Sequence, residues 1–443
     1  MSIRLSDHFT YKRLFRFVLP TIIMMVIGSV YSIVDGFFVS NFIGKNAFAA
    51  VNLIMPIVMA AGAAGFMIGT GGSALVAKTL GEGDTEKANR IFSMLVYVLV
   101  LFGIAISVIG FIFLPQLARM IGADDTLIDD CVLYGRILLA GNTAFMLQNC
   151  FQSFLIVAEK PKMGLTLSIA GGITNVMLDY LFIYVFGWGV AGAAVATMLG
   201  QMVSGLVPLF YFLRKNDSLL RLTKPVMDLR ALGRSCANGS SEMVTSLSSS
   251  LIGVLYNYRL IQFAGADGIS AYGVIMYVNF IFLAMFLGYS VGSSPVVSYH
   301  YGAGNQSELK NLFKKSMVII SVTSVAMRVL SQVLALPLAK IFVGYDQELL
   351  DMTHIAFRLY STSFLLCGFN IFGSGFFTAL NNGLLSAVIS FMRTLVVQVI
   401  AVLVMPMIFG INGIWLALTV AEGVTLIVTV WLLISQRKRY QYA

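Results

Sequence analysis

Four carboxylates lie inside long apolar stretches of this sequence, where ionised side chains are rare. They are Asp35, Asp179, Glu242 and Glu422. Because a charged side chain in the apolar core of a bilayer is costly, each one is a candidate for binding a cation, carrying a proton or pairing with a base.

Asp35 and Asp179 show the most informative spacing. At a rise of about 1.5 Å per residue, Asp35 lies roughly 28 Å along its helix from the basic residue Arg16, and Asp179 roughly 25 Å from Lys162. Thr197 enters from the opposite side of the bilayer and reaches a similar depth, and Asn175 shares a helix face with Asp179. Two carboxylates, an amide and a hydroxyl could hold a hard cation such as Na⁺ or share a proton. Alternatively, the four groups only satisfy one another.

A second group of charges lies in the other half of the chain. Glu242 is surrounded by serines and threonines over residues 240–250, so we expect this helix face to line a cavity. Glu242 is either a functional carboxylate or a buried hydrogen-bonded glutamate. Arg393 and Glu422 both fall near mid-span on adjacent predicted helices, and we expect a structural ion pair.

The composition requires these residues to be carried by membrane-spanning helices. Of 443 residues, 58% are hydrophobic and 11% are charged, and the mean hydropathy is +0.88. This composition excludes a soluble enzyme, a nucleic-acid-binding protein and a peripheral amphipathic protein. Since about 20 apolar residues cross a bilayer, the sequence predicts twelve transmembrane helices, at about 14–42, 48–78, 91–116, 131–157, 163–186, 190–213, 235–263, 268–298, 311–337, 350–379, 384–409 and 412–434.

The charges between these helices predict their orientation. Most of the 29 Lys and Arg residues fall on one side if both termini are cytoplasmic, and the opposite loops are acidic. The excess of positive charge in cytoplasmic loops therefore places both termini inside the cell. We expect a multi-pass protein of the cell (inner or plasma) membrane.

The two halves of the sequence align with each other at an offset of 221 residues, which is interrupted by a two-residue gap and then returns, with Gly192 on Gly413. Phe42-Ile43-Gly44 falls on Phe263-Ala264-Gly265, and the same offset carries Gly81-Glu82-Gly83-Asp84 onto Gly302-Ala303-Gly304-Asn305. Because the offset spans six helices, an even number, both copies have the same orientation. The predicted fold is an all-α polytopic membrane protein with two parallel six-helix lobes and pseudo-two-fold symmetry: residues 1–213, a cytoplasmic linker 214–234, and residues 235–443. Transporters use the cavity between such repeats for alternating access.

Several motifs resemble the MATE family of multidrug and toxic compound extrusion transporters, in particular its DinF-like and MepA-like branches. They are Leu19-Pro20, residues 34–39 (Val-Asp-Gly-Phe-Phe-Val), Gly81-Glu82-Gly83-Asp84, residues 175–179 (Asn-Val-Met-Leu-Asp) and residues 192–197 (Gly-Ala-Ala-Val-Ala-Thr). The resemblance covers all twelve helices. The seventh departs from it, since Ser235-Cys236-Ala237-Asn238-Gly239 stands where many members have a proline.

The resemblance implies antiport of cationic, amphipathic organic compounds against protons or sodium ions. It carries the first-lobe cation site onto Asp35, Asn175, Asp179 and Thr197, and it links bending of the first helix, at Pro20, to protonation of such an aspartate. Glu242 resembles a second-lobe acidic residue of some members, which implies a site for a cationic substrate or a proton. We expect a monomer without a cofactor, with small organic molecules and the lipid bilayer as partners and no nucleic acid. The alternative is a flippase or exporter of lipid-linked precursors or metabolites. No enzyme motif is evident among three histidines near the span ends.

The remaining polar residues in the spans receive structural interpretations. We expect the four cysteines to be packing thiols, His300 to be interfacial, and Arg136, Arg259 and Arg358 to extend toward the bilayer surface. Arg328 is central in its predicted helix without an evident partner.

Overall fold

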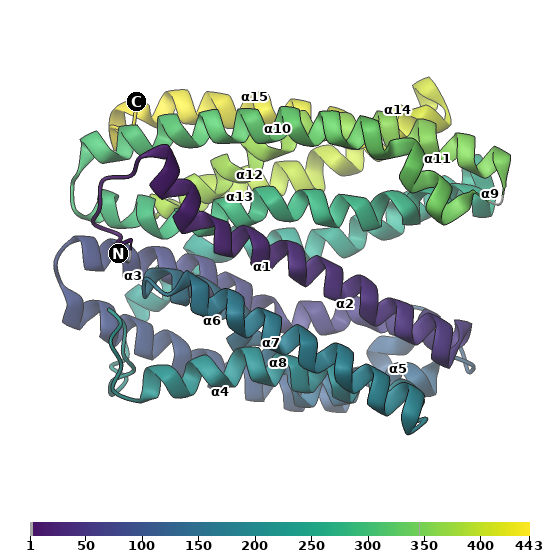
Figure 1. Ribbon diagram of the computed structural model, residues 1–443, viewed down its shortest axis with the longest axis horizontal. Coiled ribbons are helices and arrows are strands. Elements are labelled where there is room, and N and C mark those ends of the chain that lie inside the picture. The colour runs from purple at the N-terminus through teal and green to yellow at the C-terminus, as the bar shows by residue number, and fades with distance from the viewer. Residues whose placement is uncertain (1–2, 345) are drawn as a thin grey trace.

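The structure is a computed structural model that describes residues 3–344 and 346–443, and within them every regular element is a helix. The helices run lengthwise along the molecule, and both ends of the chain lie at the same end of it (Figure 1). The first half of the chain forms one group of helices and the second half the other, with α1 running between them.

The first lobe contains helices α1 to α8. Its elements are α1 (Tyr11–Phe38) with the π-helical η1 (Val39–Ile43), α2 (Lys45–Met67), η2 (Ile68–Gly72), α3 (Ser73–Gly81), α4 (Thr85–Met120), α5 (Ile128–Ala140), α6 (Asn142–Val157), α7 (Pro161–Asp179) with the π-helical η3 (Tyr180–Val185), and α8 (Gly189–Leu213).

The second lobe repeats this order. Its elements are α9 (Leu229–Gly302), α10 (Gln306–Val343), α11 (Gln347–Tyr360), η4 (Ser361–Ser363), α12 (Phe364–Ala379), α13 (Gly383–Phe391), the π-helical η5 (Met392–Val396), α14 (Val397–Phe409) and α15 (Ile411–Tyr440). Helix α9 corresponds to two predicted spans, because Gly265 has φ 58° and ψ −142°, a left-handed conformation that turns the chain there.

The predicted spans match helical segments of the structure. Ten segments of the described residues are long and apolar enough to cross a membrane. The part of α9 before Gly265 and the α5–α6 segment complete the twelve. The first is rich in serine, and the second is interrupted at Gly141, where a Cβ would lie 2.4 Å from Met198 Cγ of α8.

Several predicted boundaries are wrong by more than a turn, because the helices extend beyond the predicted spans: α4 begins at Thr85 rather than near residue 91, α10 covers 306–343 rather than 311–337, and α15 ends at Tyr440 rather than near residue 434. Helix α9 begins at Leu229 rather than near residue 235. Asp228 explains the earlier start, because its side chain accepts hydrogen bonds from the backbone N–H groups of Arg230 and Ala231 and so caps the helix.

The two lobes meet through a contact that occurs twice. A Cβ on Gly81 would lie 2.0 Å from the Tyr299 carbonyl oxygen, and one on Gly302 would lie 2.0 Å from the Lys78 carbonyl oxygen. The offset that relates the two halves of the sequence carries Gly81 onto Gly302 and Lys78 onto Tyr299. The two contacts are therefore related by a two-fold axis between the lobes, and only glycine permits this approach of backbones.

The residues before α1 also join the lobes at the end that holds both termini. The backbone N–H of Leu5 donates to Glu159 Oε1 of the first lobe at 2.7 Å. The N–H of Phe9 donates to Glu308 Oε1 of the second lobe at 2.9 Å, and Lys315 Nζ donates to the Phe9 carbonyl at 2.6 Å. Leu5 and Phe9 are fully buried. Nothing in the sequence pattern indicated this bridge.

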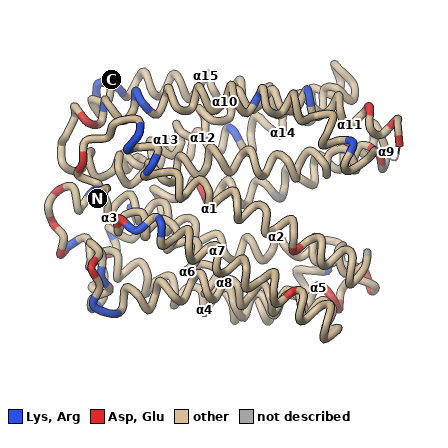
Figure 2. The backbone as a smooth tube through the Cα atoms, in the orientation of Figure 1, with Lys and Arg blue, Asp and Glu red and all other residues tan. Residues whose placement is uncertain are grey.

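Charged residues concentrate at the two ends of the molecule, with few between them (Figure 2). The four cysteines are free, and Cys131, Cys150 and Cys367 are buried in the helix packing, as predicted.

Candidate functional site

Helices α1, α7 and α8 approach closely through glycines of α7. The Tyr31 ring of α1 lies against Gly172, where a Cβ would be 1.8 Å from Tyr31 Cε2. Tyr31 Oη also donates to the Ile169 carbonyl at 3.4 Å. Where α7 meets α8, a Cβ on Gly171 would lie 2.2 Å from Ser204 Oγ. Since a larger residue at either glycine would separate the helices, Gly171 and Gly172 set the distances between the polar groups further along them.

The four residues predicted for the first-lobe site come together at this junction. Thr197 Oγ1 of α8 donates to Asp35 Oδ1 of α1 at 3.3 Å, and Asn175 Nδ2 of α7 donates to Thr197 Oγ1 at 3.4 Å. Asp179, one turn after Asn175, interacts electrostatically with Asp35. Helix α7 ends at Asp179, and the π-helical η3 follows, a distortion that is frequent at functional sites.

Asp179 has the environment expected of a cation or proton site. It is 0% exposed, and among the described residues its carboxylate has no hydrogen-bond partner other than the carboxyl group of Asp35, which can donate only if one of the two acids is protonated. A buried carboxylate without a donor is unfavourable, and a bound cation or proton would remove that penalty. No three His, Cys, Asp or Glu side chains cluster in the described part of the chain. A cation here would therefore rely on both carboxylates and on the oxygens of Asn175 and Thr197, a set suited to hard cations.

A cavity of about 250 Å³ opens onto this site. Asp35, Asn175 and Thr197 line it, whereas Asp179 lies behind them. The cavity is also lined by polar side chains that the sequence analysis did not identify: Tyr134, Gln148, Gln152, Gln201 and Ser204. Their spacing was a usable signal. Gln148 and Gln152 are four residues apart, as are Thr197 and Gln201, so each pair shares one helix face.

Pro20 lies where α1 packs against the second half of the chain. It is buried in α1, which remains α-helical from Tyr11 to Phe38 across it. Two residues later, the Cα of Ile22 would lie 2.5 Å from a Cβ on Gly288 of α9. Any bend of α1 near Pro20 would therefore be transmitted to α9.

Arg393 and Glu422 form an ion pair in the second lobe. Arg393 Nε lies 2.7 Å from Glu422 Oε1. Glu422 Oε2 accepts a hydrogen bond from Asn370 Nδ2 at 2.7 Å, and Asn370 Oδ1 accepts one from Thr429 Oγ1 at 2.7 Å. Arg393 lies within the π-helical η5. The glutamate is thus held from two sides, while the arginine is held from one.

Glu242 lies outside the second-lobe cavity. It is half-buried and within electrostatic range of Arg393, but it does not line the cavity that Arg393 and Glu422 border. Of its polar neighbours on α9, Thr245 and Ser249 do line that cavity. Their hydroxyls donate to carbonyls of their own helix, which satisfies them without a ligand.

The two cavities are copies of one another. Many residues that line the first cavity have a counterpart, at the offset of the sequence repeat, that lines the second cavity. The pairs are Met24 and Thr245, Gly28 and Ser249, Tyr31 and Ile252, Ser32 and Gly253, Met55 and Met276, Met59 and Phe280, Thr197 and Leu418, and Gln201 and Glu422. Where α7 and α13 begin, at Pro161 and Gly383, the offset is one residue larger, so Gly171 corresponds to Arg393 and Gly172 to Thr394. The second cavity, of about 300 Å³, therefore has the same frame with different charges.

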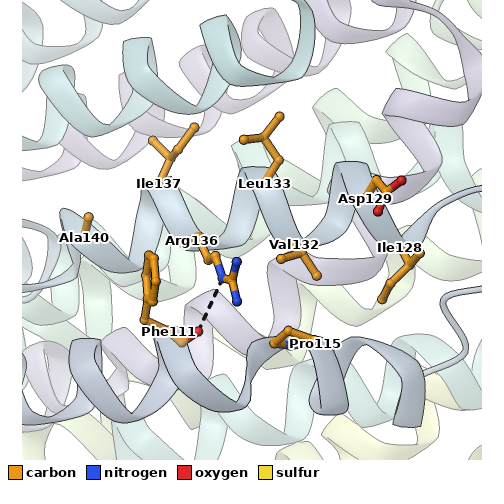
Figure 3. A pocket seen from close by; sticks show the side chains of 9 residues that line it. All are labelled: Phe111, Pro115, Ile128, Asp129, Val132, Leu133, Arg136, Ile137 and Ala140. Atoms are coloured by element: carbon orange, nitrogen blue, oxygen red, sulfur yellow. Dashed lines mark hydrogen bonds between the residues drawn. The ribbon is translucent and has the colours of Figure 1, made fainter.

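A larger groove lies on the periphery of the first lobe, between α4 and α5. Figure 3 shows Arg136 reaching across it toward Phe111 and Pro115. Arg136 Nε donates to the Phe111 carbonyl at 3.4 Å, and the guanidinium lies 4.8 Å from the centre of the Phe111 ring. This groove holds none of the predicted site residues, so the candidate site is the first-lobe cavity.

The other intramembrane cations have backbone or side-chain partners. Arg328 donates to the Arg358 carbonyl at 3.1 Å and to Ser361 Oγ at 2.8 Å, which supplies the partner that the sequence did not reveal. Arg358 Nε donates to Gln332 Oε1 at 3.2 Å.

Arg259 donates to the Leu403 carbonyl at 2.7 Å. His300, near the end of α9, is buried and packs edge-on against the ring of the bridging residue Phe9.

The fold and its buried charges define a polytopic α-helical membrane protein built from two copies of a six-helix unit. The chain belongs to the MatE family, whose model matches residues 20–181 and again residues 242–404. The two matches begin at Pro20 and Glu242, a separation close to the offset read from the motifs. The protein is thus a multi-span membrane protein of the MATE multidrug efflux family, as the motifs predicted.

Known proteins of this family resemble the chain over nearly its whole length. The multidrug export protein MepA of Staphylococcus haemolyticus is 23% identical over 97% of this chain and 94% of its own. MepA of Staphylococcus aureus is 21% identical over 93% and 91%.

Solved structures share the fold. A MATE family transporter of the MOP superfamily in an outward-facing conformation has a TM-score of 0.92 at 23% identity, covering 98% of both chains. A MATE structure in the straight conformation has the same score, identity and coverage.

Proposed function

We propose that the protein is a secondary active transporter that exports cationic, amphipathic organic compounds in exchange for protons or sodium ions. The observation that carries the proposal is the first-lobe acid pair. Asp35 lines the cavity, while Asp179 is buried behind it with no hydrogen-bond partner among the described residues other than Asp35 itself. The names of the MepA relatives, multidrug export proteins, support the direction and the substrate class.

The coupling ion binds at Asp35 and Asp179, with Asn175 and Thr197 as further oxygen ligands if the ion is Na⁺. Because Asp35 and Pro20 are both on α1, which also packs against α9, ion binding changes the contact between the lobes as well as the cavity. The ion and the substrate therefore favour different conformations, which is the requirement for exchange.

The protein lies in the cell membrane with both termini in the cytoplasm and acts as a monomer. Its loop charges support this orientation. Cysteine introduced at Lys224 should react only with a reagent on the cytoplasmic side, and cysteine at Asp346 only with one on the outside. The reverse pattern would overturn the orientation, and equal labelling from both sides would contradict the number of spans.

Transport in vesicles tests the proposal. Purified protein is placed in vesicles with a fluorescent organic cation, and a pH gradient and a sodium gradient are imposed separately. One of the two gradients should drive accumulation of the cation against its own gradient. Movement that follows only the cation's gradient would contradict coupled export and favour a facilitator or a flippase of the same superfamily.

A further inference from the structure

We propose that the second-lobe cavity binds the carboxylate of an amphipathic substrate through Arg393, so that the compounds exported include zwitterions and organic anions. The inference deepens the proposed function, because it assigns the ligand of the second cavity to the transported compound. It rests on the geometry of Arg393, on its exposure and on the comparison of the two repeated cavities.

Arg393 has hydrogen-bonding capacity that its ion pair does not use. Only Nε donates to Glu422, and the two terminal nitrogens of the guanidinium donate to no other described residue. A guanidinium offers a planar fork of donors that matches a carboxylate. One edge of this fork is therefore free for a second carboxylate.

The exposure of the pair decides the sign of the charge that a ligand meets. The side chain of Arg393 is 13% exposed, and that of Glu422 is 1% exposed. Glu422 is further held by Asn370 behind it. Although both residues border the cavity, the group accessible from it is the positive one.

Comparison of corresponding positions in the two cavities shows that the first lobe has no arginine where the second has Arg393. The counterpart of Arg393 is Gly171, against which Ser204 Oγ packs, and the Tyr31 ring covers the adjacent Gly172. The counterpart of Tyr31 is Ile252, a smaller side chain that lines the second cavity. Glu422 stands where the first lobe has the neutral Gln201. The acid that faces the first cavity, Asp35, has Tyr256 as its counterpart.

The rest of the cavity fits an aromatic or aliphatic body attached to the carboxylate. Met276, Phe280 and Phe364 line it together with the polar side chains of Asn279 and Gln398. Thioethers and aromatic rings adapt to varied apolar shapes, and a volume of about 300 Å³ accommodates a small drug-sized ligand.

A matched pair of fluorescent probes isolates the carboxylate. Nε-dansyl-lysine and dansylcadaverine differ only in that the first carries a carboxylate beside its ammonium group. Binding is measured by dansyl fluorescence on the purified full-length protein without any ion gradient. Since hydrogen bonds to charged groups contribute substantially, wild type should bind dansyl-lysine at least about tenfold more tightly than dansylcadaverine.

The test variant is the double substitution Arg393→Gln with Glu422→Gln, which leaves no unpaired buried charge and gives position 422 the glutamine of the first lobe. It should lose the preference for dansyl-lysine and still bind dansylcadaverine. Arg136→Gln, which removes an arginine outside the cavity, should keep the preference. So should Asp35→Asn, which is expected to abolish coupled transport.

The proposal would be overturned by wild type without the preference, by a preference that survives the double substitution, or by equal loss of both probes in that variant. Binding of neither probe by wild type would do the same. Failure of gradient-driven transport with the carboxylate preference intact would instead contradict only the proposed antiport.

Discussion

The two lobes use one cavity frame for opposite charges. In the first lobe, Asp35 faces the cavity and a second acid is buried behind it, and no basic residue is among the described residues that line the cavity. In the second, the accessible group is Arg393, and its carboxylate partner lies beneath. Many lining positions correspond between the lobes, but the residue types differ at each of the pairs given above except Met55 and Met276. The first lobe is suited to a coupling cation, and the second to a charged group of the substrate.

The largest effect is expected from neutralising the first-lobe acids. Asp35→Asn and Asp179→Asn each remove a cation-binding, titratable charge at nearly constant volume, so coupled export should be abolished while expression is retained. Transport in vesicles under the driving gradient measures the loss. Asp125→Asn, which changes an exposed acid paired with Arg119, is the control. If either variant, properly folded, exported at the normal rate, that residue would have no coupling role.

The next effect is antagonism between the coupling ion and the substrate. Typical coupling of about 1–3 kcal/mol would weaken substrate binding roughly 5–150-fold when the ion is present, and the effect is reciprocal. Titration of a fluorescent substrate with sodium added, or at lower pH, measures it. Asp35→Asn should lose this dependence, whereas the Arg393→Gln and Glu422→Gln double variant should keep it, since its ion site is intact. A substrate affinity insensitive to both ions would refute exchange.

The sequence was sufficient to predict the number of helices, their orientation and the two-lobe repeat. These features follow from hydropathy, loop charge and the offset between the halves, which are averaged over whole helices. The sequence also placed Asp35, Asn175, Asp179 and Thr197 at one depth, since helix rise converts sequence spacing into distance. It could not show that Asp179 is shielded from the cavity. That depends on how closely α1, α7 and α8 approach.

The features missed by sequence analysis depend on contacts between distant segments. In the bridge before α1, Leu5 binds Glu159 of the first lobe and Phe9 binds Glu308 of the second lobe, and both glutamates lie far along the chain. The ion pair of Arg393 and Glu422 was predicted from depth alone, but which partner faces the cavity is set by side-chain packing. The equivalence of the two cavities was available in the offset of the repeat, yet only the structure shows which of the paired positions line them.

A smaller effect is expected where the first lobe depends on a glycine that the second lobe does not need. Gly172→Ala places a methyl group in the Tyr31 ring, and such overpacking costs about 1–3 kcal/mol. Because it separates α1 from α7, ion affinity should fall about tenfold. Tyr31→Ile, which copies the second lobe, should restore much of it in the double variant. Gly28→Ala lines the same cavity with open space around it and should be neutral. If Gly172→Ala left the ion affinity unchanged, the first lobe would not depend on this close packing of α1 and α7.

The smallest effect concerns Thr197, whose counterpart in the second lobe is Leu418. Its hydroxyl donates to Asp35 and accepts from Asn175, so it fixes the cavity-facing acid relative to α7. Thr197→Val keeps the shape and removes both bonds. A net hydrogen bond is worth about 1 kcal/mol, so ion affinity should fall about fivefold, measured as the sodium concentration or pH of half-maximal response. Thr174→Val is the matched control, because that hydroxyl donates to the Ala170 carbonyl of its own helix. An equal loss in both variants would show that any β-branched hydroxyl near α7 matters only for helix packing. A loss confined to Thr197→Val would show that the first lobe needs an oriented oxygen where the second needs only an apolar side chain.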